Sequence, residues 1–168
     1  MRLSSKDATV VPVMAVTSAI GHMAIGPLVN RTLHLPGPTL AGIVIMVPLL
    51  VAGALTVKKG MILATSILNG VVLSAFVPIG VLAIPVDAAV GATLELFCLR
   101  SFAMLFQPFH SFLAGGVANG VSVFLIATIV LGLRSLLIVS AAVALGFVTG
   151  ALGGVIAAAV AGRTRSLR

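Results

Sequence analysis

The sequence predicts an all-α integral membrane protein: a single transmembrane domain, residues 1–168, in which six helices cross the bilayer. Hydrophobic residues make up 60% of the chain, charged residues only 8%, and the mean hydropathy is +1.30. A span needs roughly 20 apolar residues, so six spans use about 120 residues and leave only short connections. No additional soluble domain fits in this length.

The first three spans end at polar or basic stretches. The first apolar run, residues 8–28, is followed by a polar connection from Asn30 to Pro38, and its length without a clear cleavage site favours a retained helix over a signal peptide. The second run, residues 39–57, stops at the turn Lys58-Lys59-Gly60. The third, residues 61–79, ends among prolines and glycines that interrupt the helical pattern.

Prolines and basic residues also delimit the last three spans. The fourth, residues 84–107, is entered through Pro85 and closed by Pro108. The fifth covers residues 109–133 and the sixth residues 136–161, and each is followed by arginine. Basic residues are retained on the cytoplasmic side of membrane proteins, so the ends of the spans predict the orientation.

The basic residues favour an arrangement with both termini in the cytoplasm. In that orientation most of them fall inside, and the +7 formal charge is a topology signal rather than a sign of nucleic-acid binding. Those inside are Arg2, Lys6, Lys58, Lys59, Arg163, Arg165 and Arg168, Arg100 lies toward that side, and those outside are Arg31 and Arg134.

Two of the three acids of the chain, Asp87 and Glu95, lie on one face of the fourth span. A charge near the middle of a bilayer costs at least about 2.5–3.5 kcal/mol, so this face must meet protein, water or a ligand. Asp87 also suits a cap at the start of its helix, just after Pro85. Nothing basic on its own helix faces Glu95, which makes it the leading candidate for solute binding.

Further polar residues are expected at similar depth. Asn69 and Asn119 lie near the middle of the third and fifth spans, and His22 lies toward the outside in the first. Together with the two acids they would form a ladder of donors and acceptors, which suits a small-molecule site or a proton path. The alternative for the asparagines is hydrogen bonding between helices, and for His22 ordinary packing.

Small residues recur at four-residue spacing in two spans, which permits close helix approach. In the first span Ala15 and Ala19 form such a pair, which could face a partner protein. In the last span internal packing of the bundle is the favoured interpretation. That ridge comprises Gly146, Gly150, Gly154, Ala158 and Gly162.

Enzymatic motifs are absent from the sequence. No lysine completes a phosphate-binding loop, the histidines lack metal-ligand spacing, and there is no G-x-S-x-G elbow. We therefore expect no enzyme activity, no cofactor and no metal site. The single cysteine, Cys98, is expected to be a packing residue.

The layout resembles the S components of energy-coupling factor (ECF) transporters, the substrate-binding subunits of vitamin importers related to ABC transporters. The resemblance covers most of the chain and consists of six short spans with both ends inside and four stretches of sequence. These are Ala15-Val16-Thr17-Ser18-Ala19, Leu35-Pro36-Gly37-Pro38-Thr39-Leu40-Ala41-Gly42, Pro48-Leu49-Leu50-Val51-Ala52-Gly53-Ala54-Leu55 and Gly60-Met61-Ile62-Leu63-Ala64.

The resemblance implies a multi-pass plasma-membrane protein that captures a vitamin-like solute outside the cell. A coupling transmembrane subunit and two ATPase subunits would then drive its delivery inside. Ala15 and Ala19 match the motif that meets the coupling subunit in that family. The resemblance places Asn30, Arg31 and His34 in a lid region, and Asp87, Glu95 and Asn119 in or near the pocket.

Two other hypotheses remain open on the sequence alone. One is an accessory or structural subunit of a larger membrane complex, with the small-residue faces packed against other chains. The other is a small proton-coupled carrier that uses Glu95 as its proton site. Under the leading hypothesis, two acids and two amides favour a solute with hydrogen-bond donors or a positive charge, and the alternative is a carboxylate paired with Arg31.

Overall fold

The computed structural model describes residues 4–33, 38–77, 79–99 and 101–166, with side chains except at positions 27–33, 165 and 166. Six α-helices joined by short helical turns make up these ranges, which contain no strand. The α-helices are α1 (Ser5–Leu33), α2 (Pro38–Thr56), α3 (Met61–Ser74), α4 (Ala83–Cys98), α5 (Pro108–Leu125) and α6 (Leu136–Ser166), and the short turns are η1 (Gly80–Leu82), η2 (Phe102–Phe106) and η3 (Ile126–Val130).

Within the described residues, five stretches are long and apolar enough to cross a membrane, which agrees with the predicted class of all-helical membrane protein. α3 is apolar but has only 14 residues, about 21 Å at 1.5 Å per residue, and is shorter than a typical hydrocarbon core. The five stretches are Ser5–Gly26, Pro38–Thr56, Gly80–Cys98, Pro108–Val130 and Leu136–Thr164. Which end of the bundle faces the cytoplasm stays a prediction.

The last helix, α6, continues to Ser166 rather than ending at residue 161, and the other predicted boundaries need three corrections. α1 continues through Asn30 and Arg31 to Leu33, because the helix-breaking Pro36 and Gly37 come only later. α3 ends at Ser74 rather than at residue 79.

The third correction concerns the fourth span, which ends at Cys98 rather than at residue 107. Ser101 adopts an extended backbone (φ −168°, ψ 130°), and its side chain accepts a hydrogen bond from Ala103 N, which begins the turn η2. Gln107 is also extended (φ −93°, ψ 119°), because the ring of the following Pro108 disfavours a helical residue before it. The chain therefore turns twice before α5 begins.

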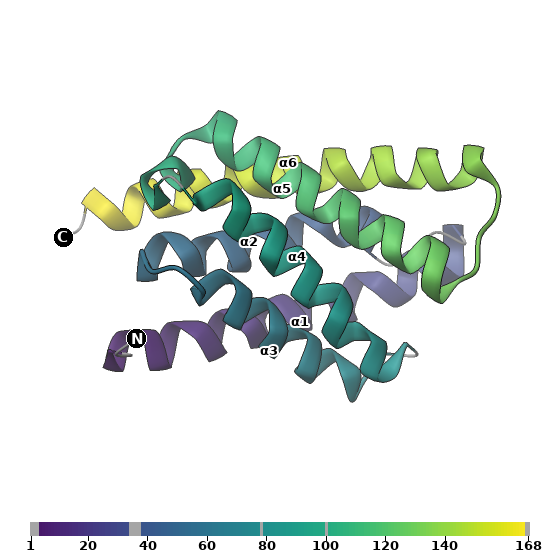
Figure 1. Ribbon diagram of the computed structural model, residues 1–168, viewed down its shortest axis with the longest axis horizontal. Helices are drawn as coiled ribbons and strands as arrows, with labels where there is room; N and C mark the ends of the chain where they lie inside the picture. The colour runs from purple at the N-terminus through teal and green to yellow at the C-terminus, as the bar shows by residue number, and fades with distance from the viewer. Residues whose placement is uncertain (1–3, 34–37, 78, 100, 167–168) are drawn as a thin grey trace.

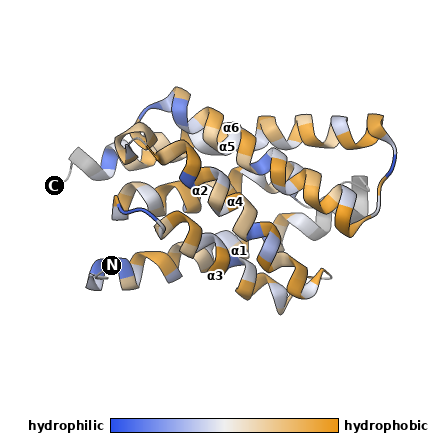
Figure 2. Ribbon diagram, in the orientation of Figure 1, coloured by the Kyte–Doolittle hydropathy of each residue, from blue (hydrophilic) through white to orange (hydrophobic). Residues whose placement is uncertain are grey.

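α6 packs mainly against α5 and α2, α3 pairs with α4, and α1 lies against α2 and α3. The start of α1 and the end of α6 lie at the same end of the bundle (Figure 1). We call this the basic end, and it also contains the turn between α2 and α3 with Lys58 and Lys59. Lys58 pairs there with the buried Asp7, which ties α1 to that turn. Figure 2 shows hydrophobic residues along the helices, with hydrophilic residues concentrated near their ends.

Glycines set the distance between α5 and α6. A Cβ at Gly154 would collide with the backbone oxygen of Ser111, and Cβ atoms at Gly115 and Gly150 would each collide with the backbone oxygen of the other. Helices in lipid associate through such close packing, since lipid is as apolar as their side chains. The small-residue ridge of the last span is therefore internal, as the favoured interpretation of the sequence predicted, although a Cβ at Gly162 would contact nothing.

We predict that Gly154→Ala destabilises the protein, because the added methyl has no space beside Ser111. Overpacking of this kind costs about 1–3 kcal/mol, which should lower the unfolding midpoint measured in detergent. Gly162→Ala on the same helix is the matched control and should leave the midpoint unchanged or raised, since alanine favours helix. Equal midpoints for the two variants would show that the described contact is wrong.

Candidate functional site

Asn119 on α5 connects three helices at the start of α2. Its Nδ2 donates hydrogen bonds to the backbone oxygens of Pro38 (3.0 Å) and Gly146 (2.7 Å), and to Thr149 Oγ1 (3.3 Å). Thr149 in turn donates to the backbone oxygen of Thr39 at 2.8 Å. We call Thr39, Asn119 and Thr149 the α2–α5–α6 cluster, and it lies at the opposite end of α2 from the basic turn.

Two oxygens of this cluster have no hydrogen-bond partner among the described residues. They are Asn119 Oδ1 and Thr39 Oγ1, and both side chains are fully buried. A buried polar atom left without a partner costs about 1–3 kcal/mol, so such atoms are rare in folded proteins. The orientation of the amide is well determined, because its nitrogen faces three acceptors. Its oxygen is therefore buried without a donor among the described residues.

Gly42 makes room for this arrangement. A Cβ at this position would collide with Asn119 Nδ2, and it would also lie too close to Thr149 Oγ1. Gly150 on α6 lies equally close to the Asn119 side chain. The two glycines let α2 and α6 approach the amide from both sides, so the cluster depends on backbone contacts as well as on its polar atoms.

A second polar contact joins α3 to α4. Asn69 Nδ2 donates to Asp87 Oδ2 at 2.6 Å, and Ser66 Oγ donates to the Asp87 backbone oxygen at 2.6 Å. Gly70 and Gly91 allow these two helices to approach closely. Asn69 Oδ1 has no partner in the described part of the chain. The contact of Asn69 with Asp87 thus agrees with the alternative of hydrogen bonding between helices, and it leaves one acceptor unused.

Glu95 lies next to the basic turn rather than near mid-depth, which corrects the prediction for it. Its Oε1 accepts hydrogen bonds from the backbone N–H groups of Ile62 (3.0 Å) and Leu63 (3.4 Å) in the first turn of α3. Those N–H groups lack acceptors within their own helix, and the positive end of a helix favours a carboxylate. Glu95 thus caps α3 from α4, and a bound solute is not needed to explain it.

The remaining predicted site residues are on or after α1. His22 is half-buried beside Gly21, where α1 contacts Val44 of α2. Asn30 and Arg31 belong to the helix rather than to a loop, and their side chains are outside the described part, as is the whole of His34.

Ala15 and Ala19 are fully buried within the chain, where they pack against other helices of the bundle, and a contact with a partner protein stays a prediction. Between them, Ser18 Oγ donates a hydrogen bond to the backbone oxygen of Ile45 on α2 at 3.3 Å. Spacing of small residues predicts close approach of some helix, and here that helix belongs to the same chain. The exposed face of α1 carries Val13, Val16 and Ile20 instead.

Sequence reasoning missed Thr39 and Thr149. A threonine in an apolar helix usually bonds its own backbone one turn earlier, so its presence carries no signal of a site. Thr56 and Thr65 behave in this way. The Gly42 position, one turn from Thr39, is the only local hint that another side chain approaches α2 there.

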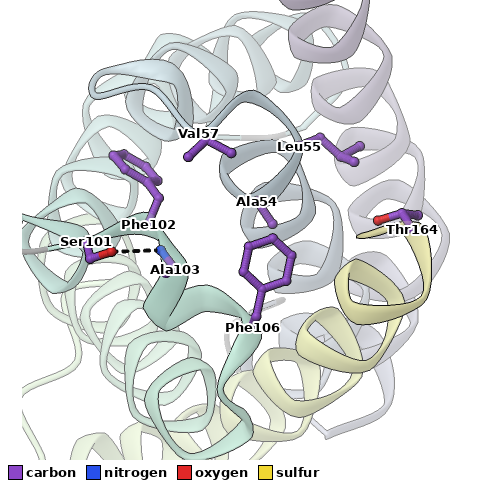
Figure 3. A pocket seen from close by; sticks show the side chains of 8 residues that line it. All are labelled: Ala54, Leu55, Val57, Ser101, Phe102, Ala103, Phe106 and Thr164. Carbon is purple, nitrogen blue, oxygen red and sulfur yellow. Dashed lines mark hydrogen bonds between the residues drawn. The ribbon is translucent and has the colours of Figure 1, made fainter. Parts of the chain in front are cut away.

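A cavity of about 290 Å³ opens at the basic end (Figure 3). None of the predicted solute-binding residues whose side chains the structure describes lines it. Its walls come from the end of α2, from η2 and from the end of α6: Ala54, Leu55, Val57, Ser101, Phe102, Ala103, Phe106 and Thr164. This cavity and the α2–α5–α6 cluster are therefore separate features, about the length of α2 apart.

A comparison with solved structures finds the same architecture. A crystal structure of an S-component of an ECF transporter matches this chain with a TM-score of 0.78 over 99% of its residues and 87% of that chain, at 18% sequence identity. The chain has the fold of an ECF S-component. The resemblance stated from the sequence is confirmed at the level of the fold. No protein-family model and no curated protein matches the sequence.

We predict that Glu95→Ala lowers the free energy of unfolding by about 1 kcal/mol, the usual cost of losing a helix cap. Glu95→Gln should lose less, because its amide oxygen still accepts from α3. The unfolding midpoint in detergent is the measurement. If the alanine variant were as stable as the wild type, the capping role assigned to Glu95 would be refuted.

We also predict strong coupling between Asn69 and Asp87. Asn69→Ala leaves the buried carboxyl group of Asp87 without its donor, which destabilises the protein. Removing Asp87 as well then costs little more, because its hydrogen bond is already lost. The double variant with Asp87→Ala should therefore be about 1–3 kcal/mol more stable than the sum of the single effects. Thr93→Ala, whose hydroxyl bonds only Ala89 of its own helix, is the control and should be additive with Asn69→Ala.

Proposed function

We propose that this chain is the membrane-embedded solute-binding subunit of an ECF-type importer. The chain captures a vitamin-like small molecule from outside the cell, and partner subunits use ATP to deliver it inside. The observation that carries the proposal is the S-component fold over nearly the whole chain. The partners would be a coupling transmembrane subunit and two ATPase subunits, as in the family that the chain resembles.

The α2–α5–α6 cluster is the proposed binding place for the solute. It lies at the start of α2, which is the outer end of that helix in the predicted orientation. The cluster draws on three helices, and polar groups inside a membrane protein commonly mark a solute path. A solute that displaces the local packing of α2 would meet Thr39 Oγ1 and Asn119 Oδ1, the two oxygens that lack partners.

The hydrogen-bonding capacity of these atoms supports a solute that offers donors. The buried polar side-chain atoms that lack partners in the described residues are all oxygens: Thr39 Oγ1, Asn69 Oδ1 and Asn119 Oδ1. Amide oxygens are acceptors only, and a hydroxyl can also accept. The site therefore suits a solute that presents N–H or O–H donors. No cation lies among the polar contacts of the cluster, which disfavours a carboxylate-rich solute.

Solute entry requires the cluster to open. Thr39 and Asn119 have no exposed surface, so a solute reaches them only when the first turn of α2 separates from α5 and α6. The bonds that close the cluster are few: two from Asn119 and Thr149 to α2 backbone oxygens. An interhelical hydrogen bond in a membrane contributes on the order of 0.6 kcal/mol, so the binding energy of a solute can readily offset their loss.

We predict that Thr39→Val lowers solute affinity at least tenfold, or about 1.4 kcal/mol, without destabilising the fold. The Thr39 hydroxyl makes no hydrogen bond within the described protein, so replacing it by a methyl group of similar size removes only a group available to the solute. The measurement is the amount of small molecule that copurifies with the protein, identified and quantified by mass spectrometry.

Thr65→Val is the matched control for this experiment. Thr65 is also fully buried, but its hydroxyl bonds Met61 of its own helix and should have no part in solute binding. The control should retain the solute that the wild type retains. The proposal fails if no small molecule copurifies with the wild type, or if Thr39→Val retains as much as Thr65→Val.

A further inference from the structure

The cavity at the basic end has an apolar interior and a polar edge. Phe102 and Phe106 extend into it from η2, and Ala54 and Leu55 approach from α2 (Figure 3). Ser101 and Thr164 supply its hydroxyl groups. Thr164 lies across the cavity from η2, on the last turns of α6. The space thus lies where three segments end, close to the expected membrane surface.

Basic residues border this cavity in the structure and in the sequence. Lys6 Nζ donates a hydrogen bond to the backbone oxygen of Leu55, a lining residue. Lys58 and Lys59 directly follow the lining residue Val57, and Lys59 is exposed. Thr164 stands between Arg163 and Arg165 in the sequence. The nearby acid Asp7 is already paired with Lys58, so the remaining charge bordering the cavity is positive.

The lining of the cavity favours one kind of occupant. The volume of about 290 Å³ is bounded mainly by phenyl and aliphatic groups and lies between the ends of three segments. A narrow, flexible and apolar chain suits such a space, and the basic residues at its edge suit a negatively charged head group.

We propose that this cavity binds one acyl chain of an anionic phospholipid, whose phosphate group is held by the basic residues at the edge. Basic pockets between helices on the cytoplasmic side of membrane proteins bind anionic head groups in this way. The apolar walls exclude a free phosphate ion as the main ligand, because an ion would gain nothing from Phe102 and Phe106. The site is separate from the α2–α5–α6 cluster and does not depend on the transport role.

The test uses the full chain in detergent micelles that contain equal amounts of phosphatidylglycerol and phosphatidylcholine. Native mass spectrometry counts the lipids that stay bound. We expect the wild type to retain phosphatidylglycerol over phosphatidylcholine by at least about fivefold. Ala103→Phe should lower retention of both lipids to background, since Ala103 is exposed at the mouth and a phenyl ring there fills the cavity.

Two further variants separate the chain from the charge. Ala141→Phe makes the same substitution at an exposed position near the other end of α6 and should bind lipid as the wild type does. Lys59→Gln should reduce the preference for phosphatidylglycerol without reducing binding of phosphatidylcholine. Lys59 is exposed, so Lys59→Gln should not disturb the fold. This variant therefore tests the proposal even if Ala103→Phe is unstable. Equal retention of the two lipids by the wild type, or wild-type retention by Ala103→Phe, would overturn the proposal.

Discussion

The amide of Asn119 is the contact on which the proposed site depends. A single side-chain nitrogen is shared by the α2 backbone, the α6 backbone and a hydroxyl on α6, so three helices are fixed relative to one another. The position of the amide group also fixes its oxygen, which has no partner in the described protein. The same interaction thus holds the bundle together and presents an acceptor to a potential ligand. Gly42 and Gly150 provide the space that makes it possible.

Close backbone contacts explain why so apolar a chain adopts one arrangement. Apolar surface gives little specificity in lipid, so glycine contacts and buried polar groups must select which helices pair. Here α5 and α6 meet through Gly115, Gly150 and Gly154, and α3 and α4 through Gly70 and Gly91. The ion pair between Asp7 and Lys58 then fixes the start of α1 at the basic end. The polar groups at these helix contacts have partners within the described protein, apart from the buried oxygens of Thr39, Asn69 and Asn119.

The positions of the helices along the chain could be predicted from the sequence. The partner that each helix face contacts could not. Apolar runs with prolines and basic residues at their ends located six helices, because those features act locally. Glu95 was misplaced because its partners are backbone N–H groups of Ile62 and Leu63, which every residue possesses and no sequence pattern reveals. Ala15 and Ala19 were assigned to a partner because spacing identifies a close contact but not the helix that makes it. For Thr39 the only sequence signal is the nearby Gly42, which does not identify the side chain that approaches it.

These placements also bear on the competing hypotheses. The small-residue faces that suggested an accessory subunit are largely occupied within the chain, and the carboxylate that suggested a proton carrier caps α3. The most direct test of solute capture is an experimental structure of the protein with its copurified solute. We predict a small molecule within hydrogen-bond distance of Thr39 Oγ1 and Asn119 Oδ1. A solute bound elsewhere, with both oxygens still buried between α2, α5 and α6, would contradict this prediction.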